Sequence, residues 1–427
     1  MNKILLIFSI YLLFLLPKIN LISVGNFSAG LRVDDLVIAT IASVLVWRGA
    51  IKARLGPTLW AREERWFWTF FFVCLFSALY NTVVFDRSSL LFPLRFAEYF
   101  VFYYMGLALF SSGQKKIDKL VSVVFWANSA VAGLQILHVI GGFTVNGYRP
   151  DVSDRVIGLT SGPWELGVVL NIISCYFLAR SDCSKTKKTI VFLISTLLIL
   201  ANGSRMSLMA QFAIILMVFV FSGGVVRALK GAIAAVPLLL AVAVILGSTT
   251  VADRSANLFS YENISSMQSS FASFRVTEEA PSWRELDRPT DSGDLDESWS
   301  IRVPKWIYAA KMWALNPGNM LWGVGPGTFG NALDGGWLRL LSETGILGVL
   351  FFILMIKTIY GYGGGVRLMV VALSINLFFI DIYMAYKVMS ILFFMLGCTR
   401  AERIAGSVNR IYDNQRSSVG PSVPSPA

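Results

Sequence analysis

Arginines are the residues of this chain whose type and placement point most directly to chemistry. A guanidinium group is permanently charged and binds phosphate oxygens through a planar fork of N–H groups. The candidates lie in, or just inside, segments that connect long apolar runs: Arg95, Arg149, Arg155, Arg205 and Arg302. Arginines at these positions are candidates for binding a phosphate-bearing ligand and for stabilising negative charge on a departing phosphate group.

Some of these arginines also have a purely structural interpretation. Glu98 follows Arg95 by about one helical turn, so the two side chains could form an internal ion pair. Arg149 and Arg155 fall in a loop and could equally be solvated charges.

Several other kinds of site are not supported by the sequence. The segment Gly325–Gly330 matches G-x-G-x-x-G, but no strand precedes it, so we reject a dinucleotide site. The single histidine, His138, lies in an apolar run and is expected to be a satisfied interior side chain. The cysteines show neither metal-ligand spacing nor an external pair. We therefore expect no metal and no other cofactor.

The composition excludes a water-soluble globular protein. Hydrophobic residues make up 55% of the 427 residues and charged residues only 15%. Because a bilayer core of about 30 Å needs about 20 apolar residues per helix, the chain can form about twelve membrane-spanning helices. We place them at 4–24, 35–51, 66–85, 90–111, 119–141, 163–180, 188–201, 206–222, 229–248, 337–358, 366–381 and 383–398.

These runs divide the chain into four regions. Residues 1–248 contain the first nine spans, 249–336 form a large external loop, 337–398 contain the last three spans, and 399–427 form a disordered cytoplasmic tail. Lysines and arginines concentrate in alternate connections, which places both termini in the cytoplasm. This asymmetry also explains the net charge of +11 without a nucleic-acid partner.

The large loop has two parts. Residues 265–300 are rich in Ser, Asp, Glu and Arg and are expected to be mobile. An amphipathic helix is predicted over 304–316, with Pro304 in its first turn and with Trp306 and Trp313 on its apolar face. The alternative is that this helix only packs against the protein.

Four short segments carry a family resemblance. After the loop, Gly323–Gly327 forms a Gly-x-Gly turn, and Trp337–Gly345 fits a helix of the form aromatic, Leu, spacer, Leu, small, Glu, x, Gly. Asn202–Arg205 contains a Ser-Arg pair that opens a span, and Gly158–Gly167 leads into an earlier one. Together with the layout of spans and one late external loop, these segments resemble the O-antigen polymerase and ligase superfamily of bacterial envelope glycosyltransferases.

The resemblance implies an all-α, GT-C-like fold in the bacterial inner membrane, with its active site facing the periplasm. The implied reaction transfers a glycan from undecaprenyl diphosphate to a sugar hydroxyl, which builds O-antigen or exopolysaccharide from lipid-linked repeat units. The implied partners are donor and acceptor glycans, membrane lipid, a flippase and a chain-length regulator.

One departure favours polymerase over ligase. The ligases that attach glycan to the lipid A core carry a catalytic His where this chain has Asp334, so the chain is more similar to the Wzy-type polymerases. Motif position makes Asp334 the first candidate for a general base, followed by Glu165 at the mouth of its span. Asp334 could instead cap the helix that follows it. Trp337 could stack on a sugar ring or anchor the helix at the interface.

Two alternative functions remain at this stage. One is an O-antigen ligase that transfers polysaccharide to the lipid A core. The other is a transporter of polysaccharide or lipid-linked sugar. Transporters commonly contain two related halves, and the sequence shows no internal repeat.

Overall fold

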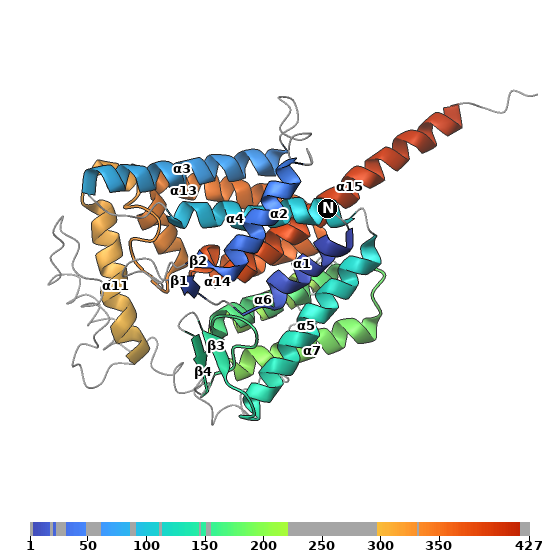
Figure 1. The fold of residues 1–427 in the computed structure, drawn as a ribbon, viewed down its shortest axis with the longest axis horizontal. Coiled ribbons are helices and arrows are strands. Elements are labelled where there is room, and N and C mark those ends of the chain that lie inside the picture. Colours follow the sequence, from blue (N-terminus) through green and yellow to red (C-terminus); the bar gives the residue numbers. More distant parts are fainter. Residues whose placement is uncertain are drawn as a thin grey trace, which may run out of the picture.

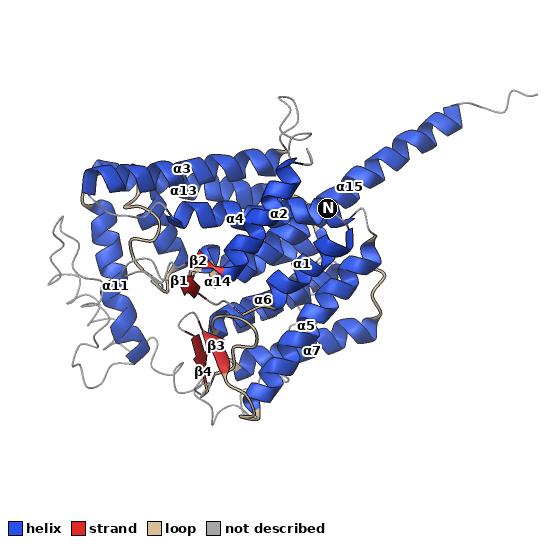
Figure 2. Ribbon diagram, viewed as in Figure 1, coloured by secondary structure: helices blue, strands red, loops and turns tan. Residues whose placement is uncertain are grey.

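A computed structural model describes residues 3–17, 20–22, 31–47, 61–85, 91–110, 113–144, 147–150, 155–220, 297–330 and 333–418. Helices make up most of this part of the chain (Figure 2), which confirms the predicted helical class. The helices are α1 (Lys3–Leu15), α2 (Val33–Trp47), α3 (Arg62–Phe85), α4 (Leu91–Phe110), α5 (Gln114–Ile136), α6 (Pro163–Ala179), α7 (Lys185–Ala201), an unlabelled helix Arg205–Val220, α11 (Glu297–Ala314), α12 (Pro317–Trp322), α13 (Gly336–Tyr360), α14 (Gly364–Asn376), the 3-10 turn η2 (Ile382–Met384) and α15 (Tyr386–Ser418).

Two short antiparallel ribbons interrupt the helical fold within the described residues. Strand β1 (Asn20–Ile22) pairs with β2 (Leu31–Arg32), and β3 (Gly142–Thr144) pairs with β4 (Gly147–Arg149). The first ribbon begins inside the span predicted at 4–24. Helix α1 ends at Leu15 because Pro17 follows, and proline disfavours helical backbone at the residue before it.

Three of the described helices are long and apolar enough to cross a membrane: Arg62–Val83, Gln114–Ile136 and Gly336–Tyr360. Shorter apolar helices cover Ile4–Leu15, Pro163–Ala179, Arg205–Val220 and Gly364–Asn376. Association with a membrane follows from these helices. The number of about twelve spans stays a prediction. The span expected at 229–248 lies outside the described residues, and so does the loop expected at 265–300 apart from the first turn of α11.

Within the described residues, the helices from α3 to Arg205–Val220 and those from α13 to α15 run in alternating directions. The starts of α4, α6, α13 and α15 meet the ends of α3, α5, α7 and α14 at one end of the bundle, here named the Asp381 end. The turn between α13 and α14 lies at the opposite end, where it contacts the start of α3 and the middle of α15; we name this the Glu63 end. Such alternation is what successive membrane spans require.

The core is built around α4, α6 and α15. Helices α4 and α15 cross closely because Gly106 and Gly397 lie at the crossing, where an added Cβ would come within 2.2 Å of the Phe394 carbonyl oxygen or 2.1 Å of the Tyr103 carbonyl oxygen, respectively. Helix α6 is buried continuously from Glu165 to Phe177. Because all its faces are covered, its hydrophobicity is not confined to one stripe.

Helix α11 differs from the predicted amphipathic helix in its start. It begins at Glu297, so Pro304 lies inside the helix rather than in its first turn. Tertiary contacts hold the turn before the proline, since Val303 is buried and Arg302 forms an ion pair. Figure 1 shows α11 lying across the ends of α3 and α13, at the Asp381 end.

The C-terminal segment also differs from the prediction. Helix α15 continues to Ser418 and projects beyond the rest of the molecule (Figure 1), whereas 399–427 was predicted to be disordered. The residues that follow Thr399 include Ala, Glu, Arg and Ile, which favour or tolerate helix without a core to pack against.

Candidate functional site

The glycine-rich segment after α12 contacts a break in α13. Gly345 inside α13 has φ 68° and ψ −175°, which interrupts the helix. The carbonyls near this break accept hydrogen bonds from the loop: Val324 N donates to Ser342 O at 2.8 Å, and Gly325 N donates to Glu343 O at 3.0 Å. The Gly-x-Gly turn at Gly323–Gly327 therefore folds against the helix segment Trp337–Gly345.

Glycine is required where the loop crosses α13. Gly323 has φ 81°, and a Cβ at this position would lie 2.3 Å from the Glu343 carbonyl carbon. At Gly345 a Cβ would lie 2.2 Å from the Leu321 carbonyl oxygen. This is the close backbone approach that the glycines predict.

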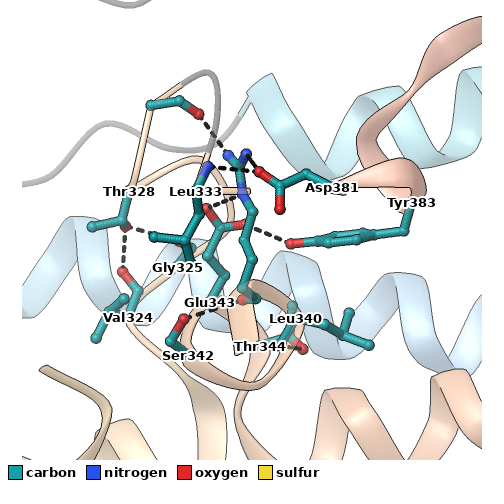
Figure 3. A network of polar contacts seen from close by, with 12 residues as sticks. Val324, Gly325, Thr328, Leu333, Leu340, Ser342, Glu343, Thr344, Asp381 and Tyr383 are labelled. Carbon is teal, nitrogen blue, oxygen red and sulfur yellow. Dashed lines mark hydrogen bonds and ion pairs between the residues drawn. The ribbon is translucent and has the colours of Figure 1, made fainter. Parts of the chain in front are cut away.

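A buried guanidinium organises this region. Arg339 is 1% exposed, and its Nε lies 3.0 Å from Glu343 Oε1 while its Nη1 lies 2.9 Å from Asp381 Oδ2. Its Nη2 donates to Gly330 O at 2.6 Å, and Tyr383 Oη donates to Glu343 Oε2 at 2.9 Å. Figure 3 shows Glu343, Asp381 and Tyr383 converging on this cluster, which we call the Arg339 network. Its members pair with one another, as buried charges must.

Asp381 also binds the backbone that leads into α13. Its Oδ2 accepts hydrogen bonds from Leu333 N at 2.7 Å and Asp334 N at 3.3 Å, and its Oδ1 accepts one from Gly335 N at 3.2 Å. Asp381 thus connects the α14–α15 junction to the turn before α13.

The two residues favoured by the motif reasoning form an ion pair. Arg302 Nε lies 2.9 Å from Asp334 Oδ2, and the side chains are 30% and 38% exposed. Asp334 has φ 56°, an uncommon conformation for a residue other than glycine and one that often marks functional sites. It does not cap α13, because Gly335 occupies the N-cap position and no side chain caps the helix there.

A second group of arginines lies at the start of the helix Arg205–Val220. Arg155 Nε donates to Asn202 O at 2.8 Å and its Nη2 to Gly203 O at 3.5 Å, in the turn just before Arg205. The Asn202 side-chain amide donates to Pro163 O at 3.1 Å, which joins this turn to α6. The structure therefore brings Arg155 next to the Ser-Arg motif.

The segment between α14 and α15 links the two arginine groups. Ser207 Oγ donates to Asn376 Oδ1 at 3.0 Å, at the end of α14. Asp381, only a few residues further on, contacts the backbone of Asp334. Arg205 and Arg302 thus flank one connection, at the same end of the bundle.

Glu165 has a structural environment. It is fully buried, and its Oε2 accepts hydrogen bonds from Ser161 N at 2.9 Å and from Ser161 Oγ at 2.5 Å. Its Oε1 accepts one from Lys387 N at 3.2 Å, at the start of α15. These bonds join α6 to α15, so of the two candidate bases only Asp334 presents an exposed carboxylate.

The remaining predicted residues make other contacts. Arg95 is half-buried near the start of α4, with its Cζ 5.4 Å from the Phe92 ring centroid and Glu98 among its charged neighbours. Arg149 ends strand β4, and its side chain lies outside the described residues. Trp337 turns toward α14, where its Nε1 donates to Ser374 O at 3.4 Å.

A different tryptophan lies beside the ion pair. Trp306 Nε1 donates to Leu333 O at 3.0 Å, and its indole lies against Gly335. The sequence could have predicted that Trp306 lies near Arg302 only from its position one helical turn later in α11. The Arg339 network left a clearer signal, because Arg339 and Glu343 have the spacing of a helical ion pair.

The geometry at the Asp381 end suits anion binding and proton transfer. An exposed guanidinium and carboxylate lie together on a backbone held by buried charges, and a second guanidinium group lies nearby. Among the described residues, no cluster of His, Cys, Asp and Glu has an arrangement that could hold a metal ion. No protein-family model matches this chain, and no curated protein matches it either.

Proposed function

We propose that this protein is a membrane glycosyltransferase that polymerises oligosaccharide repeat units carried on undecaprenyl diphosphate, at the periplasmic face of a bacterial inner membrane. The observation that carries the proposal is the exposed Arg302–Asp334 pair, at 2.9 Å, beside the segment that resembles the polymerase motif. The apolar helices provide a scaffold in which lipid-linked donor and acceptor can be held.

The proposed reaction forms one glycosidic bond and breaks one bond to phosphate. A hydroxyl oxygen of the acceptor sugar attacks the anomeric carbon of the donor glycan, and the bond from that carbon to the diphosphate oxygen breaks. The hydroxyl proton passes to Asp334, and the undecaprenyl diphosphate leaves with its charge stabilised by arginine. The growing chain is thereby transferred to the incoming repeat unit.

Arg302 is suited to contact both the Asp334 carboxylate and the departing diphosphate. Its Nε faces the Asp334 carboxylate, and a guanidinium carries five N–H donors in all. The remaining donors can bind phosphate oxygens while the contact to Asp334 persists. Arg205 and Arg155, across the α14–α15 connection, provide further positive charge for a second diphosphate-linked substrate.

The polysaccharide of a strain lacking the gene tests the proposal. We expect the deletion strain to display single repeat units, and the wild-type gene to restore a ladder of lengths on a gel. Arg302→Gln and Asp334→Asn should fail to restore the ladder, whereas Arg62→Gln, an exposed arginine at the Glu63 end, should restore it.

Other outcomes would point to the alternatives. A deletion strain with no surface glycan indicates lost export or ligation, and purified protein that transfers glycan to a lipid A core is a ligase. A normal ladder from both Arg302→Gln and Asp334→Asn would refute the site. In purified form, the wild type should lengthen undecaprenyl-diphosphate-linked repeat units without a flippase, which a transporter would not do.

A further inference from the structure

Asp381 gathers backbone donors from three successive residues. The amides of Leu333, Asp334 and Gly335 lie 2.7, 3.3 and 3.2 Å from its carboxylate oxygens. Asp381 itself is 6% exposed, and Arg339 Nη1 lies 2.9 Å from its Oδ2, the oxygen that also accepts from Leu333 and Asp334. The Asp381 carboxylate is therefore bound by the Arg339 guanidinium, and it binds the backbone of residues 333–335.

The shape of this stretch explains why an anion is needed. Successive amides can point to one place when the backbone alternates between unlike conformations, as in anion-binding nests. Asp334, at φ 56°, is the residue that takes the left-handed conformation here. Such a conformation disfavours most residues with a Cβ but is more accessible to Asp, and the contacts of Asp334 with Asp381 and Arg302 stabilise it.

We propose that Asp381 is a positioning residue for the reaction. Acting through the backbone of residues 333–335, it sets Asp334 in the left-handed conformation that brings its carboxylate to Arg302. Arg339 fixes the position of Asp381, and so acts one step further from the reacting atoms. This role rests on the proposed function, because it presumes that Asp334 takes part in glycosyl transfer.

Two substitutions test the role in full-length protein reconstituted in liposomes with an undecaprenyl-diphosphate-linked repeat unit. Asp381→Asn removes the charge, and Asp381→Glu keeps the ion pair but displaces the carboxylate by one methylene group. We expect kcat to fall about tenfold to a hundredfold in both, as small displacements of catalytic groups do, while KM for the donor changes by less than about twofold. Asp118→Asn at the Glu63 end, which removes an aspartate bonded to Gln114 and Tyr176, should leave kcat unchanged.

A measurement independent of activity accompanies the kinetics. Hydrogen exchange of a peptide covering 333–335 should accelerate in Asp381→Glu and Asp381→Asn, with exchange in α6 and α15 unchanged. If Asp381→Asn does not fold, Asp381→Glu and its exchange pattern decide the matter. Wild-type kcat together with unchanged exchange in Asp381→Glu would overturn the proposal.

The double variant separates positioning from a general structural role. If Asp381 acts only through Asp334, Asp381→Asn should cause no further loss of kcat in an Asp334→Asn background. A full additional loss would overturn the proposal. If Asp334→Asn alone retains wild-type kcat, the proposed site and this role both fail, whereas loss in Asp334→Asn with none in Asp381→Glu refutes the positioning role alone.

Discussion

The two ends of the bundle use the same chemistry for different purposes. At the Glu63 end, Glu63 Oε1 accepts a hydrogen bond from Tyr103 Oη at 2.9 Å and one from Tyr362 Oη at 2.5 Å, and lies 3.0 Å from Arg400 Nη1. We call these four residues the Glu63 network. Like the Arg339 network, it joins a buried carboxylate to an arginine and a tyrosine.

The networks differ in what they hold. The Glu63 network connects side chains of α3, α4, α15 and the α13–α14 turn, and its described contacts include no backbone amide donors. Burial raises the pKa of Tyr362 well above its ordinary value, so this hydroxyl remains a proton donor across the physiological range. The Arg339 network instead extends through Asp381 to the backbone of Asp334, beside an exposed ion pair. A buried charge network can therefore tie helices together or hold the backbone beneath an exposed ion pair.

Removing the centre of the Arg339 network should have the largest effect. Arg339→Met leaves Glu343 and Asp381 as buried carboxylates without their cation, which costs about 3–5 kcal/mol of unfolding free energy. We expect a large drop in thermal stability in detergent together with loss of polymerisation. Wild-type stability in Arg339→Met would show that this network does not hold the Asp381 end together.

Substitutions in the exposed pair should separate activity from stability. Asp334→Asn and Arg302→Gln should each lower the transfer rate about a hundredfold or more, because the proposed mechanism places each of these groups at the reacting atoms. The unfolding free energy should change by less than about 1 kcal/mol, as for other partly exposed ion pairs. Rates of glycan lengthening and thermal unfolding of the same preparations measure both quantities. A loss of stability matching that of Arg339→Met would contradict the comparison.

A substitution in the Glu63 network should have the opposite profile. Glu63→Gln keeps the size of the side chain but weakens its bonds to Arg400 and two tyrosines, so we expect destabilisation of about 1–3 kcal/mol. Polymerisation per folded molecule should stay at the wild-type level, because this end lies across the bundle from Asp334. Specific activity, normalised to folded protein, is the measurement. A kcat reduced as strongly as in Asp334→Asn would contradict the assignment of the reaction to the Asp381 end.

The smallest effect is expected at an exposed pair of the Glu63 end. Hydrogen bonding to Arg180 lowers the pKa of Asp182, so any stabilisation is present above the ordinary aspartate pKa of about 3.9 and is lost as the pH falls below it. Because Asp182 is exposed, Asp182→Asn should leave both the thermal midpoint and the transfer rate unchanged at pH 7. A measurable shift in the midpoint would mean that this pair is less solvated than its exposure indicates.

Helix positions could be predicted because they depend on local properties. Each predicted span within the described residues overlaps a helix, since runs of apolar residues mark such helices wherever the rest of the chain lies. Predictions that depended on a single residue were less accurate. Pro304 was expected to start a helix, but α11 begins at Glu297 because Val303 and Arg302 are held by distant partners.

Side-chain partners depended on the tertiary structure. Composition and motifs identified Arg302 and Asp334 as candidates, but 32 positions separate them in the chain, and only the fold brings them to 2.9 Å. Glu165 was chosen by the same kind of reasoning, yet packing of α6 against α15 uses its carboxylate as a structural acceptor. Hydropathy and turn residues act over a few neighbours, so the sequence by itself determined a helical membrane protein and its site candidates. Which charges meet, and which become buried, depends on distances between remote segments, and those were decided by the folded structure.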